Sequence, residues 1–411
     1  MKGLLCLVFI SLARTSQQGQ LLRLMPDVDE AEVKECRKET ISSCTVVMIN
    51  TTVFEDGELI FPNGEVFTKS GILQEPKTRP GILDQALSIV YENNDESEAI
   101  FSIRSGMVYG SLDGRNIIQP CSLFAGCHLY RGYEEKEDEK DRDCINESVE
   151  QNLIDRTIVY SANQYKLREK GILDNTTMVE FSVKFYYTQA FGREVEEKEL
   201  FFDNAVAEAN KAYQNSKIPL RMTIFCIEPI DIKDENSLSA IHDEFTNFYK
   251  SGSNKKDFAT LRGGADATVL YTYNKDYNKC GTGGLGGWRY GATTVAIQLG
   301  CLSKQYVLAH EVGHNFGCQH EESNGDDNVN GFEYGHGTFI EGTGRRTIMC
   351  HSKPGYRSKA NFFSGPQLSY QGVPTGGAFY DNARVIRENR FAMAAIADEV
   401  GTCNSIPVGH N

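Results

Sequence analysis

One short segment of the chain concentrates side chains that bind metals. Residues 310–320 read HEVGHNFGCQH and hold three of the eight histidines of the chain. His310 and His314 are four residues apart, so on a helix both imidazoles project from one face and can share a metal ion. Glu311 lies beside them and can reach a water molecule on that metal. The spacing predicts a zinc site on a helix, with Glu311 as the catalytic base.

A third ligand follows at a spacing that a helix end explains. Gly317 stands where the helix should stop, because glycine accepts the left-handed conformation that reverses the chain. That turn can bring His320 back to the metal already held by His310 and His314. Three protein ligands leave the fourth tetrahedral position to water, as a catalytic zinc requires. The alternative is a set of ordinary core histidines, which the third His and the intervening Gly disfavour.

This segment resembles the metzincin metallopeptidases, whose extended motif is HExxHxxGxxH followed by a methionine turn. The candidate turn is Thr-Ile-Met-Cys at 347–350, and the resemblance implies that Met349 forms an apolar floor beneath the histidines. Within that clan, HEVGHNFG at 310–317 and FFSGP at 362–366 look like secreted reprolysin-like (adamalysin-type) peptidases. The resemblance is strong over residues 305–350, moderate over 177–400 and weak before 150.

Two positions depart from the family pattern. Reprolysins usually carry Asp after the third His, whereas this chain has Glu321, as astacins do. Astacins offer a tyrosine two residues after the turn methionine, and His351 occupies that position here. We therefore expect a three-histidine site without a tyrosine ligand.

The resemblance implies hydrolysis of peptide bonds in a protein or peptide substrate, with Glu311 activating a zinc-bound water. It also suggests two substrate-binding regions. The strand that begins at Gly291, Ala292 and Thr293 is the candidate for pairing with an extended substrate, although a wholly buried strand is the alternative. Residues 351–356, beginning with His351, should face the primed side. A non-catalytic secreted zinc-binding or toxin-like protein is the other functional reading, and the presence of Glu311 favours the enzyme.

The elements around the motif predict an α/β (α+β) domain with a mixed, twisted sheet. Alternating apolar residues predict strands at 179–187 and 218–226, and buried runs predict strands at 267–273 and 293–299. Helical spacing predicts four helices, at 199–215, 237–250, 303–316 and 381–400. A glycine-rich loop at 281–291 precedes the last of these strands.

The N-terminal half has a different character. Short β-like runs such as 98–104 and 106–112 predict a small β-rich domain. The charged stretch 134–150 predicts an acidic linker. Residues 1–16 have the charge and apolar pattern of a signal peptide. We expect a propeptide-like domain at 17–170, a zinc metallopeptidase domain at 176–411, and a zymogen.

Cysteine content and sequons agree with export. Eleven cysteines remain after the signal peptide, which suits disulfides in an oxidising compartment. Five of them precede residue 170, so one could remain unpaired and cap the zinc; an intermolecular or mispaired cysteine is the alternative. The glycosylation candidates are Asn50, Asn146 and Asn175. We expect a secreted, extracellular glycoprotein.

Charge and hydropathy limit the partners of the chain. The net charge of −14 argues against a nucleic-acid partner. No apolar run is long enough for a membrane span, and we expect a monomer. The polar loop 321–337, with Asp326, Asp327 and Asn328, suggests Ca²⁺ as a second ion, although a flexible loop without an ion is the competing interpretation.

Overall fold

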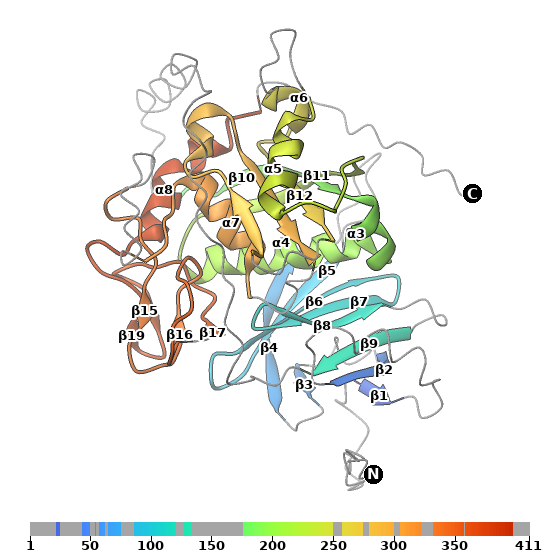
Figure 1. The fold of residues 1–411 in the computed structure, drawn as a ribbon. Helices are drawn as coiled ribbons and strands as arrows, with labels where there is room; N and C mark the ends of the chain where they lie inside the picture. Colours follow the sequence, from blue (N-terminus) through green and yellow to red (C-terminus); the bar gives the residue numbers. More distant parts are fainter. Residues whose placement is uncertain are drawn as a thin grey trace, which may run out of the picture.

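The computed structural model divides into an N-terminal antiparallel sheet and a C-terminal α/β part that meet along one helix (Figure 1). It describes residues 22–24, 43–49, 54, 57–61, 65–74, 86–120, 127–132, 176–249, 257–273, 279–299, 305–321, 332–356 and 358–397. The predicted signal peptide, the acidic linker, the three sequons and the three candidate calcium ligands lie outside these residues. No helix of the described part has the length and apolar character that a membrane span requires.

The N-terminal sheet has nine strands, and every neighbouring pair is antiparallel. Their spatial order is β1-β2-β9-β8-β7-β6-β5-β4-β3. Aromatic side chains including Phe61, Phe67 and Phe101 form a core on this sheet. The strands are β1 Leu22–Leu24, β2 Ser43–Ile49, β3 Glu58–Ile60, β4 Val66–Gln74, β5 Leu87–Glu92, β6 Glu98–Arg104, β7 Met107–Leu112, β8 Arg115–Pro120 and β9 Cys127–Gly132.

The C-terminal part is built on a five-stranded mixed sheet with the order β11-β10-β12-β14-β13. The first four strands in this order are parallel, and β13 closes the sheet as an antiparallel edge. The mixed sheet predicted from the sequence is thus present. Its strands are β10 Val179–Tyr187, β11 Leu220–Pro229, β12 Ala267–Thr272, β13 Gly281–Gly283 and β14 Thr294–Gln298.

Helices cover both faces of this sheet. On one face, Phe181, Val183 and Val269 share a core with helices α4, α7 and α8. On the other face, Tyr186 and Leu270 pack against α5 and α6. Because its strands are buried on both sides, β10 does not show the single buried face predicted for it. The helices are α3 Gln189–Glu194, α4 Lys198–Asn215, α5 Leu238–Asn247, α6 Phe258–Arg262, α7 Val307–Phe316 and α8 Asn382–Met393, with a 3₁₀ helix η3 at Gly287–Tyr290.

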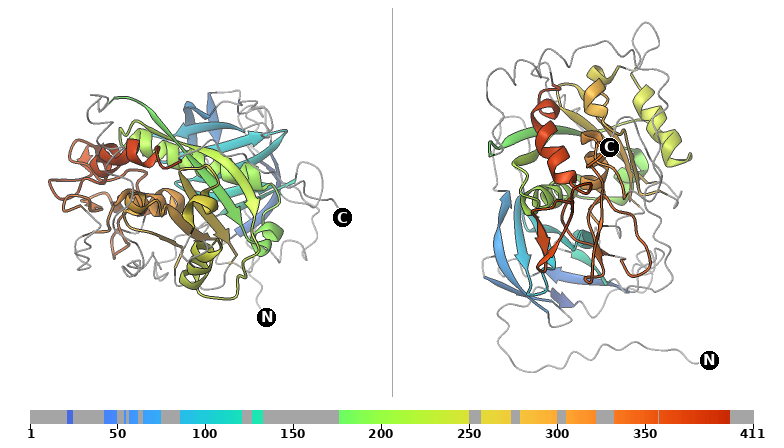
Figure 2. Two further views of the ribbon diagram at one scale, coloured as in Figure 1. Left: turned by 90° about the horizontal axis from the view of Figure 1, so that it is seen from above. Right: turned by 90° about the vertical axis from the view of Figure 1, so that its left-hand side faces the viewer.

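Helix α4 lies between the two sheets and contacts both β11 and β6 (Figure 1). Figure 2 shows the N-terminal strands, in blue and cyan, gathered on one side of the molecule. The C-terminal segments around α7 form three small pairings of short strands, β15–β16, β16–β17 and β18–β19. These strands are β15 Phe339–Ile340, β16 Arg345–Arg346, β17 Ser358–Lys359, β18 Ser369–Tyr370 and β19 Val373–Pro374.

The predicted substrate-pairing strand is not at the edge of the sheet. β14 pairs with β12 on one side and with β13 on the other, and all its residues are buried. The backbone carbonyls of Gly291 and Thr293 already accept hydrogen bonds within the protein. Arg262 donates to the Gly291 carbonyl, and the Thr268 N–H donates to the Thr293 carbonyl. The assignment of Gly291, Ala292 and Thr293 to an open edge is therefore wrong. The edge strand on this side of the described sheet is β13, within the predicted glycine-rich loop.

Candidate active site

Helix α7 carries the first two histidines and ends where the sequence predicts. Gly317 has φ of 99°, in the left-handed region, and its N–H donates to the His314 carbonyl. The helix begins at Val307 after Tyr306, which has φ of 56°. The expected start at residue 303 is therefore too early by about one turn. The turn at Gly317 brings His320 back against the helix, so that all three histidines are buried together.

The three imidazoles converge through their Nε2 atoms. The Nε2 atom of His320 lies 3.1 Å from that of His310 and 3.0 Å from that of His314. The Nδ1 atoms of His310 and His314 lie 2.8 Å and 2.9 Å from the carbonyls of Ile348 and Cys318. A carbonyl only accepts, so each of these Nδ1 atoms carries its proton and each Nε2 presents a lone pair. Burial keeps the rings neutral, because it lowers the pKa of His310 and His320 well below the usual value and that of His314 to about 4.

This donor set fits a zinc ion. Lone pairs of neutral imidazoles about 3 Å apart repel each other unless a cation or a proton lies between them. Tetrahedral coordination with Zn–N of about 2.0–2.1 Å places ligand nitrogens roughly 3.3 Å apart, which is close to the observed separations. The carbonyl partners of His310 and His314 are the kind of outer contact that orients metal-binding histidines.

Glu311 lies directly against the edge strand. Its side chain is fully buried, and a Cβ atom added at Gly281 would lie 2.5 Å from the Glu311 carboxyl carbon and from Oε1. Gly281 is thus a point of close approach between β13 and the Glu311 carboxylate. The sequence predicts a loop at Gly281 and does not reveal this role, since a run of glycines carries no periodicity that marks a strand.

Met349 packs under the metal helix. Its Sδ atom would lie 2.7 Å from a Cβ added at Gly313, so any residue with a Cβ at position 313 of α7 would clash with the sulfur. Met349 is fully buried, and the preceding Ile348 carbonyl is the one that contacts His310. The structure thereby places the predicted turn methionine beneath the histidine motif.

Glu321 and His351, the two residues that depart from the family pattern, contact each other. The backbone N–H of His351 donates to Glu321 Oε2 at 2.8 Å, and its Nδ1 lies 3.2 Å from Oε1. Burial alone would raise the pKa of Glu321, but the His351 contacts lower it to about 2. The His351 ring also lies 3.8 Å from the His320 ring, centre to centre. Glu321 therefore fixes the segment after Met349 next to the third histidine.

Cysteine pairing departs in part from expectation. Cys318 and Cys350 are free and buried, so the six cysteines of the C-terminal part do not form three disulfides. Among the five N-terminal cysteines, Cys36, Cys121 and Cys144 lie outside the described residues. The thiol proposed to cap the zinc therefore stays a prediction.

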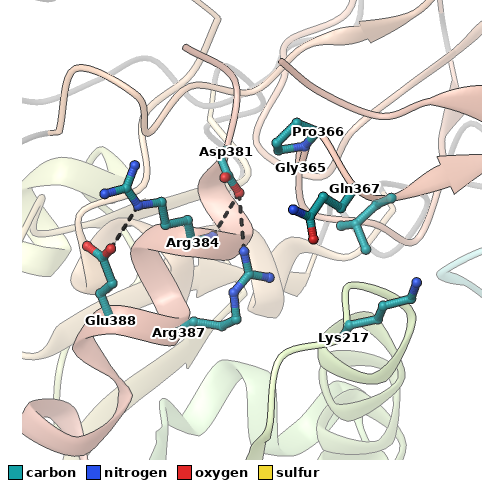
Figure 3. A pocket seen from close by; sticks show the side chains of 9 residues that line it. Lys217, Gly365, Pro366, Gln367, Asp381, Arg384, Arg387 and Glu388 are labelled. Carbon is teal, nitrogen blue, oxygen red and sulfur yellow. Dashed lines mark hydrogen bonds and ion pairs between the residues drawn. The ribbon is translucent and has the colours of Figure 1, made fainter. Parts of the chain in front are cut away.

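A surface cavity of about 430 Å³ lies elsewhere, at the start of α8 (Figure 3). Asp381, which caps this helix, and Arg384, Arg387 and Glu388 within it line the cavity together with Lys217. The charged groups are paired with each other, Arg384 with Glu388 and Arg387 with Asp381. Neither the three histidines nor Glu311 line this cavity, so it is distinct from the candidate metal centre.

Known proteins have sequences similar to about half of this chain. The curated relatives include peptidyl-Asp metalloendopeptidases from Stenotrophomonas maltophilia (strain K279a) and Xanthomonas campestris pv. campestris. Each is 30% identical over 46% of this chain, covering 46% and 45% of the relative. A peptidyl-Asp metalloendopeptidase from Pseudomonas fragi is 26% identical over 46% of this chain and 99% of its own length. The chain thus spans about half the length of the first two relatives.

Two solved structures are similar to this chain, each with a TM-score below 0.5. The crystal structure of metalloproteinase-II from Bacteroides fragilis is 12% identical with a TM-score of 0.38, and covers 84% of this chain and 95% of that one. A structure of a chaperone–substrate complex is 18% identical with a TM-score of 0.42, and covers 54% of this chain and 35% of that one.

A family match falls on the metal centre itself. Residues 202–321 match the family described as metallo-peptidase family M12B, reprolysin-like. This range begins in α4 and contains β13, α7, Glu311 and all three histidines. The predicted resemblance of this chain to the reprolysin-like metallopeptidases is thereby confirmed.

Proposed function

We propose that this chain is a zinc-dependent endopeptidase that hydrolyses bonds in protein or peptide substrates. The observation that carries the proposal is the convergence of three Nε2 lone pairs beside a buried glutamate on one helix. The relatives that match about half of this chain are named peptidyl-Asp metalloendopeptidases. We extend the proposal to cleavage at bonds next to aspartate on that ground.

The residues of the site divide the chemistry among themselves. His310, His314 and His320 would hold the zinc, which when bound polarises the scissile carbonyl and makes water a better nucleophile. Glu311 takes the proton of the attacking water and delivers it to the leaving amine nitrogen. Its burial against Gly281 restricts the carboxylate to one position, which favours proton transfer at a fixed geometry.

The substrate would pair with β13 rather than with the strand predicted first. β13 is the antiparallel edge of the described sheet and lies beside α7. An extended peptide added to this edge would pass the histidines and Glu311. Asn315 supports the arrangement, because its side chain donates to the Gly284 and Thr294 carbonyls and links α7 to the strands.

Export and latency form part of the same proposal. We propose a secreted, monomeric and glycosylated protein with a signal peptide at 1–16 and a propeptide-like domain at 17–170. The support is the sequence pattern of the N-terminus, the three sequons and the five N-terminal cysteines. Replacing each N-terminal cysteine in turn should yield one variant that activates spontaneously. If none does, latency through a thiol on the zinc fails.

The activity is tested with an unfolded protein substrate. The processed chain should cleave it, a chelator should stop cleavage, and added zinc should restore it. Glu311→Gln should bind zinc like the wild type yet lose about 10²- to 10⁴-fold in kcat/KM, because the proton acceptor is gone. Cleavage that survives the chelator, or no cleavage with Glu311 intact and zinc bound, would contradict the proposal.

A further inference from the structure

The residue that begins the metal helix is held in a strained conformation. Tyr306 precedes α7 with φ of 56°, in the left-handed region that residues other than glycine rarely adopt. Its side chain is buried. Its carbonyl accepts a hydrogen bond of 3.0 Å from the N–H of His310, the first candidate zinc ligand. A strained residue persists only where its surroundings fix it, so the contacts of Tyr306 bear on the position of His310.

A turn of the N-terminal sheet supplies such a contact. Asp113 and Gly114, with φ of 48° and 72°, form the 113–114 turn between β7 and β8. A Cβ atom added at Gly114 would lie 2.6 Å from Tyr306 Cε1 and 2.9 Å from the Tyr306 backbone nitrogen. The turn therefore lies directly against the residue that begins α7, and a side chain at position 114 would displace one of the two.

The same turn contacts the segment that leads to Met349. Asp113 Oδ2 lies 3.3 Å from Arg345 Nη2, and both side chains are less than one quarter exposed. Arg345 lies in β16, shortly before Ile348, whose carbonyl lies 2.8 Å from His310 Nδ1. Two neighbouring residues of one turn thus contact both segments that hold His310, which are the start of α7 and the chain before the methionine turn.

A third contact lies beside the turn, at Glu98 of β6. Its backbone N–H donates to Asp113 Oδ1 at 2.9 Å, and its carboxylate accepts from the Asn361 side chain at 2.7 Å. The next residue, Phe362, accepts through its carbonyl from the Ile348 N–H at 2.9 Å. Glu98 therefore links the 113–114 turn to the chain that pairs with the methionine turn.

We propose that the 113–114 turn positions the metal centre, so that the N-terminal sheet is a working part of the metalloenzyme. Gly114 acts through Tyr306, and Asp113 acts through Arg345. The effect of the turn on catalysis rests on the proposed endopeptidase function, whereas its effect on zinc affinity can be measured without any cleavage. Latency through a thiol on the zinc is compatible with this role, because it requires only that the thiol leaves the metal while the sheet stays in place.

Gly114→Ala and Gly106→Ala form a matched pair for the test. Gly106 lies in the preceding turn of the same sheet, between β6 and β7, with φ of 82°, so alanine strains both turns alike. A Cβ added at Gly106 has no atom within 4 Å, whereas one at Gly114 meets Tyr306. Gly114→Ala should weaken zinc binding and lower kcat by about 10- to 100-fold each, because the support of a metal ligand is displaced. Gly106→Ala should stay within about threefold of the wild type in both.

Asp113→Asn tests the second contact and replaces Gly114→Ala if that protein does not fold. Asparagine tolerates the left-handed conformation and can still accept from the Glu98 N–H, but the ion pair with Arg345 is lost. The kcat should fall about tenfold with KM within about twofold of the wild type. Glu199→Gln is the control, because it breaks the ion pair between Arg104 of β6 and helix α4 at 3.0 Å. It should stay within about threefold of the wild type in kcat.

The measurements separate positioning from folding. Zinc affinity is measured by competition with a chelating dye, kcat with zinc-saturated protein and an unfolded substrate, and the folded fraction by urea unfolding. A role in folding alone would lower the folded fraction but leave zinc affinity and kcat of the folded protein unchanged. That result in the folded variants of positions 113 and 114 overturns the inference. Equal losses in Gly106→Ala and Gly114→Ala also overturn it, because strain in the sheet would then explain both.

The zinc measurement also separates this inference from the proposed function. If the zinc-loaded wild type cleaves no substrate, the proposed function fails. Weaker zinc binding in Gly114→Ala than in Gly106→Ala would still support the positioning role in that case, and equal zinc affinity in the two variants would overturn it.

Discussion

At the scale of single residues, glycines set the distances within the candidate site. Gly313 admits the Met349 sulfur from below, and Gly281 admits the Glu311 carboxylate from the side. Neither glycine has a positive φ, so the absence of a Cβ is what each position requires. The sequence motif identifies the histidines and Glu311, but such close approaches depend on residues about thirty positions apart.

Gly281→Ala should impair catalysis without removing the metal. The new methyl group would lie 2.5 Å from Glu311, so the carboxylate or β13 must move. A displacement of the Glu311 carboxylate by about 1 Å lowers the rate on the order of 10²-fold. We expect that loss in kcat/KM with zinc content unchanged. Gly57→Ala is the control, since no atom lies within 4 Å of its added Cβ. Wild-type activity in Gly281→Ala would contradict the close approach.

At the scale of elements, α4 shows what the sequence pattern reveals and what it leaves out. The apolar spacing that predicts a helix at 199–215 corresponds to α4, and β6 has the predicted bounds. The polar residues Asp203, Asn204 and Glu208 of this helix are also buried. Their partners come from about 90 to 130 residues earlier, in the N-terminal sheet. Local periodicity contains no information about such contacts.

The end of α8 gives a second example. The sequence predicts a helix to residue 400, but α8 ends at Met393 and the chain turns so that Ile396 is buried. The Ala397 N–H then donates to Asp266 at 3.2 Å. No glycine or proline marks this end, so a tertiary contact determines it.

Arg104→Ala should destabilise the packing of α4 on the N-terminal sheet. Arg104 donates to Asp203 at 2.6 Å and to Glu199 at 3.0 Å, and the Asp203 side chain is only 2% exposed. Removing Arg104 leaves the buried Asp203 carboxylate without its ion pair, which lowers the unfolding free energy by about 3 kcal/mol. Urea denaturation measures this. Arg221→Ala breaks an exposed pair with Glu180 and should cost less than about 1 kcal/mol. Equal losses in both variants would refute the distinction.

At the scale of the whole molecule, the two sheets meet through buried acids. Burial raises the pKa of Glu98, Asp203 and Glu208, against hydrogen bonds that lower it in part. Glu98 bridges three parts of the chain, because it accepts from Asn215 of α4 and from Asn361 in the C-terminal region. The junction of the N-terminal sheet with the rest of the protein should therefore weaken as these carboxyls ionise.

Glu208 gives this pH dependence its clearest test. Burial raises its pKa from 4.5 to about 7, although Asn204 donates to it at 3.1 Å. Because the folded-state value is the higher one, folding favours the protonated carboxyl. This contribution is complete below the unfolded value of 4.5 and is lost as pH rises through about 7.

Glu208→Gln keeps the hydrogen-bonding shape and cannot ionise. It should match the wild type in unfolding free energy near pH 4, and exceed it by up to about 3 kcal/mol near pH 8.5. Thermal and urea unfolding across this pH range measure the difference. Glu58→Gln is the control, because Glu58 is exposed on β3 and its removal should leave the wild-type profile unchanged. If Glu208→Gln follows the wild-type curve at every pH, ionisation of Glu208 does not weaken the junction, and the contact between the two sheets must depend on pH through other groups or not at all.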